Sequence, residues 1–400
     1  MNIFREIPPT AGFPVSAKEF LQKGSLEEDF KDFLGADFAG ITCSGTAGLY
    51  LICENLKNLL KNRTAVIIPA YICPSVPWAI AKAGLKVRVC DINRQDFNFN
   101  LGELEDLCRK NEDILAIVAT HLAGIPVDLD PVAAIAKKHG IFLVEDCAQS
   151  LGAFYKGKKA GTLSDFSFFS LARGKGLTIY EGGAVVCNKK EYSAGLQQKI
   201  EQIVKDRPLA ELLKILELLG YGVFYRPQLF WFVSKLPELF WTLRDEELRA
   251  QLEYFSRDFP VQNVSGFRKS VGHACFPRLE AEINSQRQKA FEYMEGLKDV
   301  QGVTVLKEAT GDRATYPFVT LIFDEEGRRN KTLKILGSSG LGVSELYMSA
   351  IIDYPSLKDV VPAADCPGAR YLASRQATLS TSTFLRKRDL DLILKDLRSY

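Results

Sequence analysis

The stretch FLVEDCAQSLGAFYKGKKAGTLSDFSFFSLARGKGLTIYEGGAVVCN, from Phe142 to Asn188, decides the fold predicted for this chain. Its first apolar run, FLVED, ends in a carboxylate, and its second, FSFFS, ends in a hydroxyl. A single lysine lies between glycines in the segment RGKG that follows, and a glycine pair opens the next apolar run, GAVVCN. Short apolar runs rich in β-branched and aromatic residues are typical of buried strands. The stretch therefore predicts three strands, two of which end in polar groups.

These strands continue an alternation that begins at Thr64. Near-continuous apolar runs separated by helical segments predict a parallel sheet that is covered on both faces. Ligands of such sheets bind beyond the carboxyl ends of the strands. The runs are residues 65–69, 86–92, 114–120, 141–146, 166–170 and 183–188.

A hydroxyl-rich turn, Ser44-Gly45-Thr46, lies earlier in the chain and opens a segment with leucines at helical spacing. The free N–H groups and the positive dipole end at the start of a helix bind phosphate without a cation. The turn therefore predicts a phosphate site. A plain Ser N-cap is the alternative interpretation of the same residues.

Lys175 lies between Gly174 and Gly176, which give the backbone freedom and little packing support. Alone, it would be interpreted as a solvated loop lysine. An amine beside a phosphate site and a pyridinium ring is deprotonated near neutral pH and forms a Schiff base with an aldehyde. With its neighbours, Lys175 is the predicted catalytic amine.

Asp146 ends the run FLVED, where its carboxylate would be half-buried and would hold a pyridinium nitrogen protonated. Gln149 is placed to reach the same ring, and Ser170 to bind a phosphate with Arg173 as a candidate cation. The alternatives are an N-cap for Asp146, a serine at the edge of the core and a surface arginine. Together with Lys175, these groups predict a pyridoxal 5'-phosphate site.

The composition is that of an ordinary globular chain. The 400 residues are 46% hydrophobic, and this length predicts two or three domains. The net charge is +2. No global electric field therefore argues for nucleic acid or an anionic membrane as a partner. The three histidines show no metal-ligand spacing, so no metal site is predicted.

The nine cysteines are odd in number, are never spaced C-x-x-C and lie mostly in apolar runs. This pattern predicts small buried side chains in a reducing compartment rather than disulfides or a zinc site. The first residues contain charges and prolines where a signal peptide would need a continuous apolar core. We therefore expect a cytoplasmic protein.

Two other regions complete the prediction for the large domain, residues 1–260. The chain is expected to be extended to about residue 17 and helical over residues 18–34. An aromatic-rich helical insert covers residues 200–260, and charges and a proline interrupt it too closely for a membrane span. Packing on the core or on a partner subunit is favoured, and peripheral membrane contact through residues 229–243 is the alternative.

Residues 261–400 predict a smaller α+β domain. A helix pair, or one helix kinked at Pro277, is expected to lead into strands at residues 303–307 and 318–323. Helices are expected at residues 329–336 and 386–399.

At these residues the sequence resembles the DegT/DnrJ/EryC1/StrS family of pyridoxal-phosphate enzymes, which are largely sugar aminotransferases. The segment VEDCAQSLGAFYKGKKAGTLSDFSFFSLARGKGLTIYEGGAVV resembles the central block of the family. Further similarity lies in SGTAGLYL, PAYICPSVPWAIAKAGLKVRVCDI, THLAGIPVDLD, GFRKSVG and GVSELY, and it is weakest from about residue 191 to 260. The resemblance implies the type I aminotransferase fold, with a mostly parallel seven-stranded sheet in a large domain.

The resemblance also implies roles for individual residues. Lys175 would bind the cofactor covalently, Asp146 would pair with its ring nitrogen and Gln149 would lie beside the ring. Phosphate contacts are implied for Ser44, Thr46 and Ser170. It further implies a homodimer with shared active sites, which would offer the insert a surface on which to pack.

This chain departs from the family pattern at several positions. Ile72-Cys73 replaces a Thr-aromatic pair, so the usual ring-stacking aromatic is absent or replaced by Tyr71. Tyr180 stands where glycine often precedes EGG, and Gly266 where asparagine is frequent. These changes leave the lysine chemistry intact and bear on the choice of substrates.

The preferred hypothesis is an aminotransferase that moves an amino group from an amino acid to a keto group of a nucleotide-linked sugar. The resemblance implies glutamate as the donor, because it is the usual donor in the family. Arg268, Tyr347 and the N-terminal segment are candidates for substrate contact or for purely structural roles. One alternative is another pyridoxal-phosphate reaction on a sugar or small amine, such as dehydration, although the family's dehydratases carry histidine in place of Lys175. The other alternative is a protein that keeps the fold but acts as a regulator or binding partner.

Overall fold

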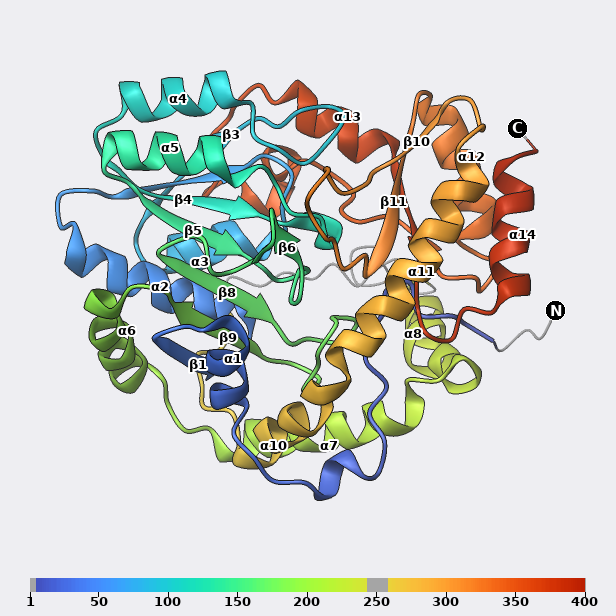
Figure 1. The fold of residues 1–400 in the computed structure, drawn as a ribbon, viewed down its shortest axis with the longest axis horizontal. Helices are drawn as coiled ribbons and strands as arrows, with labels where there is room; N and C mark the ends of the chain where they lie inside the picture. The colour runs from blue at the N-terminus through green and yellow to red at the C-terminus, as the bar shows by residue number, and fades with distance from the viewer. Residues whose placement is uncertain (1–4, 243–257, 400) are drawn as a thin grey trace.

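The protein is described from a computed structural model, which covers residues 5–242 and 258–399. Its centre is a seven-stranded sheet in the order β1-β9-β8-β5-β4-β2-β3 (Figure 1). The five strands from β8 to β3 pair in parallel, and β9 runs antiparallel between β8 and β1. The predicted mostly parallel seven-stranded sheet is confirmed. The strands are β1 (Phe38–Thr42), β2 (Ala65–Pro69), β3 (Lys86–Cys90), β4 (Ile114–Thr120), β5 (Phe142–Asp146), β8 (Phe166–Ser170) and β9 (Gly183–Cys187).

Helices cover both faces of this sheet, as its apolar strands require. On one side, α4 and α5 pack together above the strands (Figure 1). On the other, α2 packs on β8 and β9 and also contacts α3 and α6. All seven residues of β4 are buried between these layers. The helices are α2 (Gly45–Leu59), α3 (Ser75–Lys82), α4 (Leu101–Lys110), α5 (Leu129–His139) and α6 (Lys190–Ile203).

Most of residues 18–34 are helical, as predicted, but the chain breaks there between two elements. A short 3-10 helix, η1 (Glu19–Leu21), is followed by α1 (Leu26–Leu34). Ser25 caps α1, since its Oγ accepts a hydrogen bond from the Glu28 N–H at 3.3 Å. The leucine and phenylalanine spacing continues through the break, which is why the pattern suggested one helix.

A second, antiparallel sheet is built by the C-terminal part of the chain, in the order β10-β11-β13-β12. The strands predicted at residues 303–307 and 318–323 are β10 (Val303–Val305) and β11 (Phe318–Phe323). The sequence did not predict β12 (Val343–Ser344), α13 (Pro367–Arg375) and β13 (Gln376–Ser380). The domain boundary near residue 260 stays a prediction. The remaining helices are α11 (Leu279–Leu297), α12 (Glu326–Leu336) and α14 (Lys387–Leu397).

Between the two sheets, the chain forms α10 (Gly266–Cys275), a 3-10 turn, η3 (Phe276–Arg278), and then α11. The break predicted at Pro277 is therefore present, since proline begins a turn more easily than it continues a helix.

The aromatic insert forms two helices, α7 (Pro208–Phe224) and α8 (Pro227–Thr242). Tyr221 Oη donates a hydrogen bond to the Phe13 carbonyl at 2.8 Å, and Tyr225 Oη accepts one from the Gly12 N–H at 3.0 Å. The insert thereby holds the extended N-terminal segment in place. Several leucines of α7 face outward, namely Leu209, Leu212, Leu213, Leu216 and Leu219.

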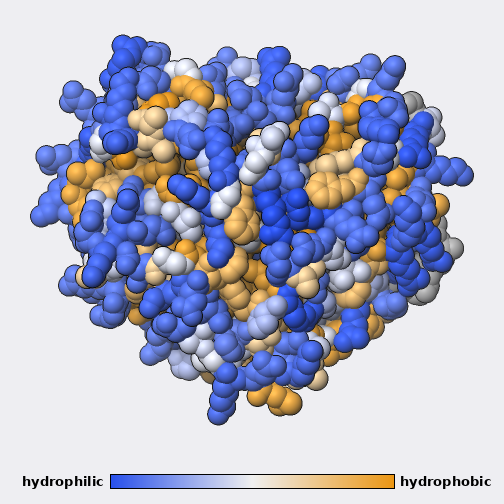
Figure 2. Space-filling model, in the orientation of Figure 1, coloured by the Kyte–Doolittle hydropathy of each residue, from blue (hydrophilic) through white to orange (hydrophobic). Residues whose placement is uncertain are grey.

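None of the helices in the described ranges is long and apolar enough to cross a membrane. Residue 243, the end of the range proposed for peripheral membrane contact, lies outside the described residues. In the view of Figure 2, hydrophilic residues cover most of the face, and hydrophobic residues reach it in patches between them.

The three histidines are held by carboxylates. His139 Nε2 lies 3.0 Å from Glu105 Oε1, and His273 Nδ1 lies 2.7 Å from Asp29 Oδ2. His121 is fully buried beside the sheet edge, where Glu145 binds it.

Candidate active site

One cavity of about 480 Å³ opens beyond the carboxyl ends of β4, β5 and β8. The N-terminal segment and the smaller sheet close it from the other side, through Thr10, Tyr347 and Thr378 among others. The seven residues predicted for the site all line this cavity, although they come from four separate parts of the chain. They are Ser44, Gly45, Thr46, Asp146, Gln149, Ser170 and Lys175.

Asp146 is the last residue of β5, and 3% of its surface is exposed. Its Oδ1 accepts a hydrogen bond from the Ala148 N–H at 3.0 Å, so the predicted capping interaction with the following turn is present. Burial raises the pKa of Asp146 to about 6, although the Ala148 N–H and the charge of Lys175 oppose the shift. The carboxyl group would be ionised more fully beside a ligand cation.

A buried pair behind Asp146 fixes the ends of β4 and β5. His121 Nδ1 accepts a hydrogen bond from the Val127 N–H at 3.1 Å, which leaves Nε2 to donate to Glu145 Oε1 at 3.2 Å. Glu145 also accepts hydrogen bonds from the N–H groups of Gly161, at 2.6 Å, and Leu163, at 2.9 Å. This pair is structural, and it holds Asp146 at the cavity edge.

The Ser44 turn is both a helix cap and part of the cavity wall. Ser44 Oγ accepts a hydrogen bond from the Ala47 N–H at 3.0 Å and so caps α2, which begins at Gly45. The first N–H groups of a helix have no carbonyl partner within it, and here they face the cavity side. Both interpretations of this turn therefore describe the same residues.

Gly183, from the EGG motif, lets the sheet approach this turn closely. A Cβ atom added to Gly183 would lie 2.5 Å from the Gly45 nitrogen. A Cβ added to Gly45 would lie 3.5 Å from Ser170 Cβ, so the end of β8 also borders the turn. The turn and the Ser170 hydroxyl together form a compact polar cradle.

Lys175 lies in the loop between β8 and β9. Its backbone N–H donates to the Ala172 carbonyl at 3.2 Å, and Gly174 before it has a φ of 73°, in the left-handed region that favours glycine. Burial lowers the pKa of the Lys175 amine, while the negative charge of Asp146 opposes this shift. The loop therefore delivers an amine that loses its proton more easily than an exposed lysine.

Gln149 is oriented by two partners. Its Oε1 accepts a hydrogen bond from the Ala123 N–H at 2.7 Å, and its Nε2 lies 3.3 Å from Tyr347 Oη. Tyr347, a candidate for substrate contact, thus links the smaller sheet to the ring-side residue predicted from the sequence. It also lines the cavity itself.

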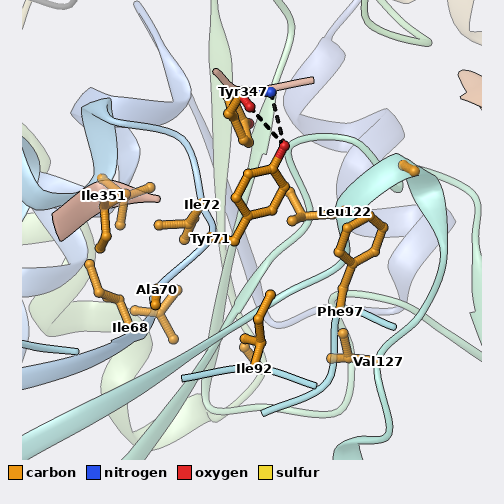
Figure 3. Packing of buried hydrophobic residues seen from close by; sticks show 14 of the residues in the cluster. Ile68, Ala70, Tyr71, Ile72, Ile92, Phe97, Leu122, Val127, Tyr347 and Ile351 are labelled. Atoms are coloured by element: carbon orange, nitrogen blue, oxygen red, sulfur yellow. Dashed lines mark hydrogen bonds between the residues drawn. The ribbon is translucent and has the colours of Figure 1, made fainter. Parts of the chain in front are cut away.

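Tyr71 does not supply the missing ring-stacking aromatic. Its side chain is fully buried and stacks on Phe97 at 6.4 Å, and its hydroxyl bonds the backbone N–H and carbonyl of Tyr347 (Figure 3). Cys73 lines the cavity in this part of the wall. The aromatic partner is therefore absent at this position, because Tyr71 points into the core.

Two further candidates do not line this cavity, which favours the alternatives of a structural role for Arg268 and a surface position for Arg173. Arg268 is 1% exposed, and its Nε and Nη2 donate to Glu211 at 2.7 and 2.8 Å, so it braces α10 against the insert and makes no contact with this cavity. Arg173, the candidate phosphate cation, lines a neighbouring cavity instead. The sequence gives only their positions, whereas tertiary contacts decide where such long side chains point.

Together, the sheet, the lysine loop, the buried carboxylate and the helix N-terminus define an α/β enzyme of the aminotransferase fold. The model of the DegT/DnrJ/EryC1/StrS aminotransferase family matches residues 20–203 and 262–398. The chain belongs to this family, which confirms the predicted family and enzyme class.

Curated relatives agree with this membership. An uncharacterized protein of Methanocaldococcus jannaschii, MJ1066, is 26% identical over 359 residues, which are 88% of this chain and 83% of that protein. A UDP-4-amino-4,6-dideoxy-N-acetyl-beta-L-altrosamine transaminase of Campylobacter jejuni is 29% identical over 275 residues, 67% of this chain and 71% of the relative.

Solved structures share the fold. Helicobacter pylori PseC, an aminotransferase involved in the biosynthesis of pseudoaminic acid, aligns over 98% of both chains with a TM-score of 0.76 and 19% identity. DesI in the presence of its TDP-sugar product aligns over 99% of this chain and 93% of its own, with a TM-score of 0.74 and 21% identity.

Proposed function

We propose that Lys175 holds pyridoxal 5'-phosphate and that the protein transfers an amino group from an amino acid, with glutamate as the first donor to test, to the keto group of a nucleotide-linked sugar. The observation that carries this proposal is the convergence of all seven predicted residues on one cavity. The names of the relatives support a sugar as the acceptor, since the Campylobacter jejuni protein is a transaminase of a UDP-linked amino sugar.

The groups around the cavity fit this cofactor. The N-terminus of α2, at Gly45 and Thr46, and the Ser170 hydroxyl would bind the phosphate, and Ser44 would fix the turn. Asp146 would pair with the ring nitrogen, whose positive charge would oppose the rise in the pKa of this carboxyl that burial causes. Bound there, the cofactor would accept the electrons left when a proton leaves the Cα atom of the amino acid.

The residues of the chain would then have two roles, proton transfer and the positioning of the ring and substrate. The Lys175 amine would take the proton from Cα as a general base and deliver it to the C4′ carbon of the cofactor as a general acid, which its lowered pKa favours. Gln149 and Tyr347 would position the ring and substrate from the side of the smaller sheet.

A dehydration is less well supported. A GDP-4-keto-6-deoxy-D-mannose 3-dehydratase of Yersinia pseudotuberculosis is 32% identical over 169 residues, which are 41% of this chain. The family's dehydratases carry histidine where this chain has Lys175, so the residue present favours amino transfer. The other alternative is the regulator hypothesis, which predicts that the protein converts no substrate.

We also propose a cytoplasmic homodimer. The nine cysteines are all free and eight of them are buried, which suits a reducing compartment. The outward-facing leucines of α7 form an apolar row that a partner subunit would cover. Contact of residues 229–243 with a membrane surface is the alternative use of the insert.

The test of this function uses the purified protein loaded with pyridoxal 5'-phosphate. Glutamate is expected to bleach the visible absorbance of the bound cofactor, and 2-oxoglutarate to restore it. Lys175→Ala should abolish both changes, while Lys158→Ala, at an exposed position outside the cavity, should leave them intact. A protein that takes up no cofactor would sink both enzyme hypotheses, and a bound cofactor that glutamate and other amino acids leave unchanged would favour the regulator.

The acceptor is then identified by a screen of nucleotide keto-sugars with glutamate, in which 2-oxoglutarate formation is followed. A sugar-dependent release of 2-oxoglutarate that Lys175→Ala loses would support the proposed acceptor class. If no nucleotide keto-sugar in the screen is converted to an amino sugar, even though glutamate yields 2-oxoglutarate, the proposed acceptor class would be contradicted.

A further inference from the structure

A second cavity, of about 310 Å³, lies beside the candidate active site. Pro9 and Thr10 line both cavities, and Gly174, which precedes Lys175, lines the second. The rest of its wall comes from α7, α8 and the loop residues Arg173 and Tyr180. The volume is at the lower end of the range for small-molecule sites, about 300 to 1,000 Å³.

Most of this wall lies outside the residues that match the family model. The family match stops at residue 203 and resumes at residue 262, and it begins only at residue 20. Both insert helices and the segment Pro8–Thr10 therefore lie outside the matched residues. The wall of the second cavity therefore comes largely from segments that the family model does not match.

The interior of the cavity is largely aromatic, and the hydroxyl groups of Tyr221, Tyr225 and Ser234 in its wall already form hydrogen bonds. Tyr221 and Tyr225 stack at 4.4 Å, with Phe230 edge-on to Tyr225 at 5.6 Å. The two tyrosine hydroxyls bond the backbone of the N-terminal segment, and Ser234 Oγ donates to the Phe230 carbonyl at 2.8 Å. What remains for a ligand is apolar surface, which suits an alkyl or aryl group.

A positive charge lies at the edge of this apolar surface. The Arg173 side chain is exposed, and its guanidinium lies 5.4 Å from the centre of the Tyr180 ring. Within the described part of the chain, no carboxylate forms an ion pair with Arg173. The acidic residue of the wall, Glu217, is instead paired with Lys214 Nζ at 2.8 Å. Arg173 is therefore available to bind an anionic group of a ligand.

Tyr180 gives an independent sign that this wall matters. Its φ is 74°, in the left-handed region where a bulky side chain is strained, and its ring packs edge-on against Tyr221 at 6.2 Å. Strained residues persist only where the surrounding structure holds them, and they cluster at functional sites. Here the strain places an aromatic ring in the wall between Arg173 and α7.

We propose that this second cavity, the insert pocket, binds a small amphiphilic anion, with an alkyl or aryl group among the aromatic rings and a phosphate or carboxylate on Arg173. The ligand would occupy a site separate from the cofactor cavity and would share with it the wall formed by Pro9 and Thr10. The proposal requires no amino transfer, so it can be tested apart from the proposed function.

The probe is n-octyl phosphate, kept below its critical micelle concentration and titrated calorimetrically into the protein after loading with pyridoxal 5'-phosphate. One site per chain is expected. Octyl glucoside, which has the same chain without the charge, should bind at least 10-fold more weakly, and inorganic phosphate should show no such site.

Two variants locate the site. Gly220→Leu places a side chain in the pocket, and a Cβ atom there meets nothing within 4 Å, so α7 should fold normally while octyl phosphate binding is lost. Gly327→Leu in α12, which is equally open, is its control. Arg173→Gln should weaken binding at least 10-fold, whereas Arg94→Gln, whose guanidinium lies 5.6 Å from the Tyr371 ring, should have no effect.

Binding that survives Gly220→Leu, or that inorganic phosphate reproduces, would overturn the proposal. Equal binding of octyl glucoside would overturn the role of Arg173. Vesicles of phosphatidic acid present the same chemistry from a bilayer, and binding to them without binding of free octyl phosphate would overturn the assignment to a small ligand. Because the readout is binding, an inactive protein that still binds octyl phosphate would count against the proposed function alone.

Discussion

The protonation state of Asp146 is set by where the chain buries it. A carboxyl whose pKa rises from 3.8 to about 6 on folding binds its proton more tightly in the native than in the unfolded state. Its contribution to stability is therefore fully present below about pH 4 and is lost as the pH rises through about 6. A cation beside Asp146 would lower the pKa of the buried carboxyl and so reduce this loss of stability at higher pH.

The first prediction concerns the cofactor-free protein. Between pH 4 and pH 7 it should lose up to about 3 kcal/mol of unfolding free energy relative to Asp146→Asn, since a shift of about two pKa units corresponds to that amount. Urea unfolding of both proteins across this range measures the difference. In the loaded protein the difference should shrink, and parallel pH profiles in the cofactor-free state would contradict the assignment.

Gly183 is the residue on which the polar cradle depends most directly. Gly183→Ala would force its Cβ against the backbone at Ser44 and Gly45, where the closest atoms are only 2.5 Å away. We expect a loss of about 1–3 kcal/mol in stability and at least a tenfold loss in cofactor affinity. Gly327→Ala, at an open helical position, is the matched control. Unchanged cofactor affinity in Gly183→Ala would show that the turn does not hold the phosphate.

At this scale, the sequence predicted the residues that the strands position and failed for those positioned by side-chain packing. Lys175, Asp146 and Ser170 follow strand ends, so the topology alone brings them together. Arg173 and Tyr71 are neighbours of such residues in sequence, yet one points into the insert pocket and the other into the core.

Among the elements, α10 and α7 are joined by a buried ion pair. Arg268 binds Glu211 through two nitrogens and also donates to the carbonyl of Ile179 at 3.3 Å, in the segment that precedes Tyr180. The brace therefore ties the insert to the loop that carries Lys175. Its energetic signature should be that of a buried pair, in which the loss of one partner costs more than the loss of both.

We predict that Arg268→Met lowers the unfolding free energy by about 3–5 kcal/mol because it leaves the Glu211 carboxylate buried without its partner. The double variant Arg268→Met, Glu211→Leu should recover part of this loss. Chemical denaturation of the two variants beside wild type measures the effect. A double variant as unstable as the sum of its single changes would contradict the buried-pair account.

Six of the seven strands of the large sheet were predictable because their residues are apolar almost without interruption, and β4 shows this most clearly. The remaining strand, β1, was not predicted from the sequence. The two residues of β12 and the mixed sequence of β13 carry no such signal, and their pairing with β11 depends on the rest of the fold. The break between η1 and α1 was missed because the apolar spacing continues across it.

For the whole molecule, the insert presents an apolar face that a lone subunit would leave in water. The side chains of Leu213 and Leu216 are 61% and 55% exposed. A stable interface buries roughly 800 Å² on each partner, so a row of such leucines is a natural part of one. The sequence indicated the apolar character of the insert and could not show which residues face outward.

We predict that the protein sediments as a dimer and that Leu213→Glu together with Leu216→Glu shifts it to the monomer. Leu392→Glu in α14, at a residue 52% exposed, should leave the dimer intact. Sedimentation velocity at several protein concentrations measures the oligomeric state of each variant. A wild-type monomer, or a dimer unaffected by the double variant, would contradict the proposed surface, and cosedimentation with vesicles would then favour the membrane alternative.

The central claim is that Lys175 is the residue that binds the cofactor, and borohydride trapping tests it most directly. The loaded protein is reduced with borohydride, digested and mapped by mass spectrometry. The account predicts the added mass of the cofactor on the peptide that contains Lys175, and none after Lys175→Ala. Labelling of another lysine in the loaded wild-type protein, with Lys175 unmodified, would contradict it.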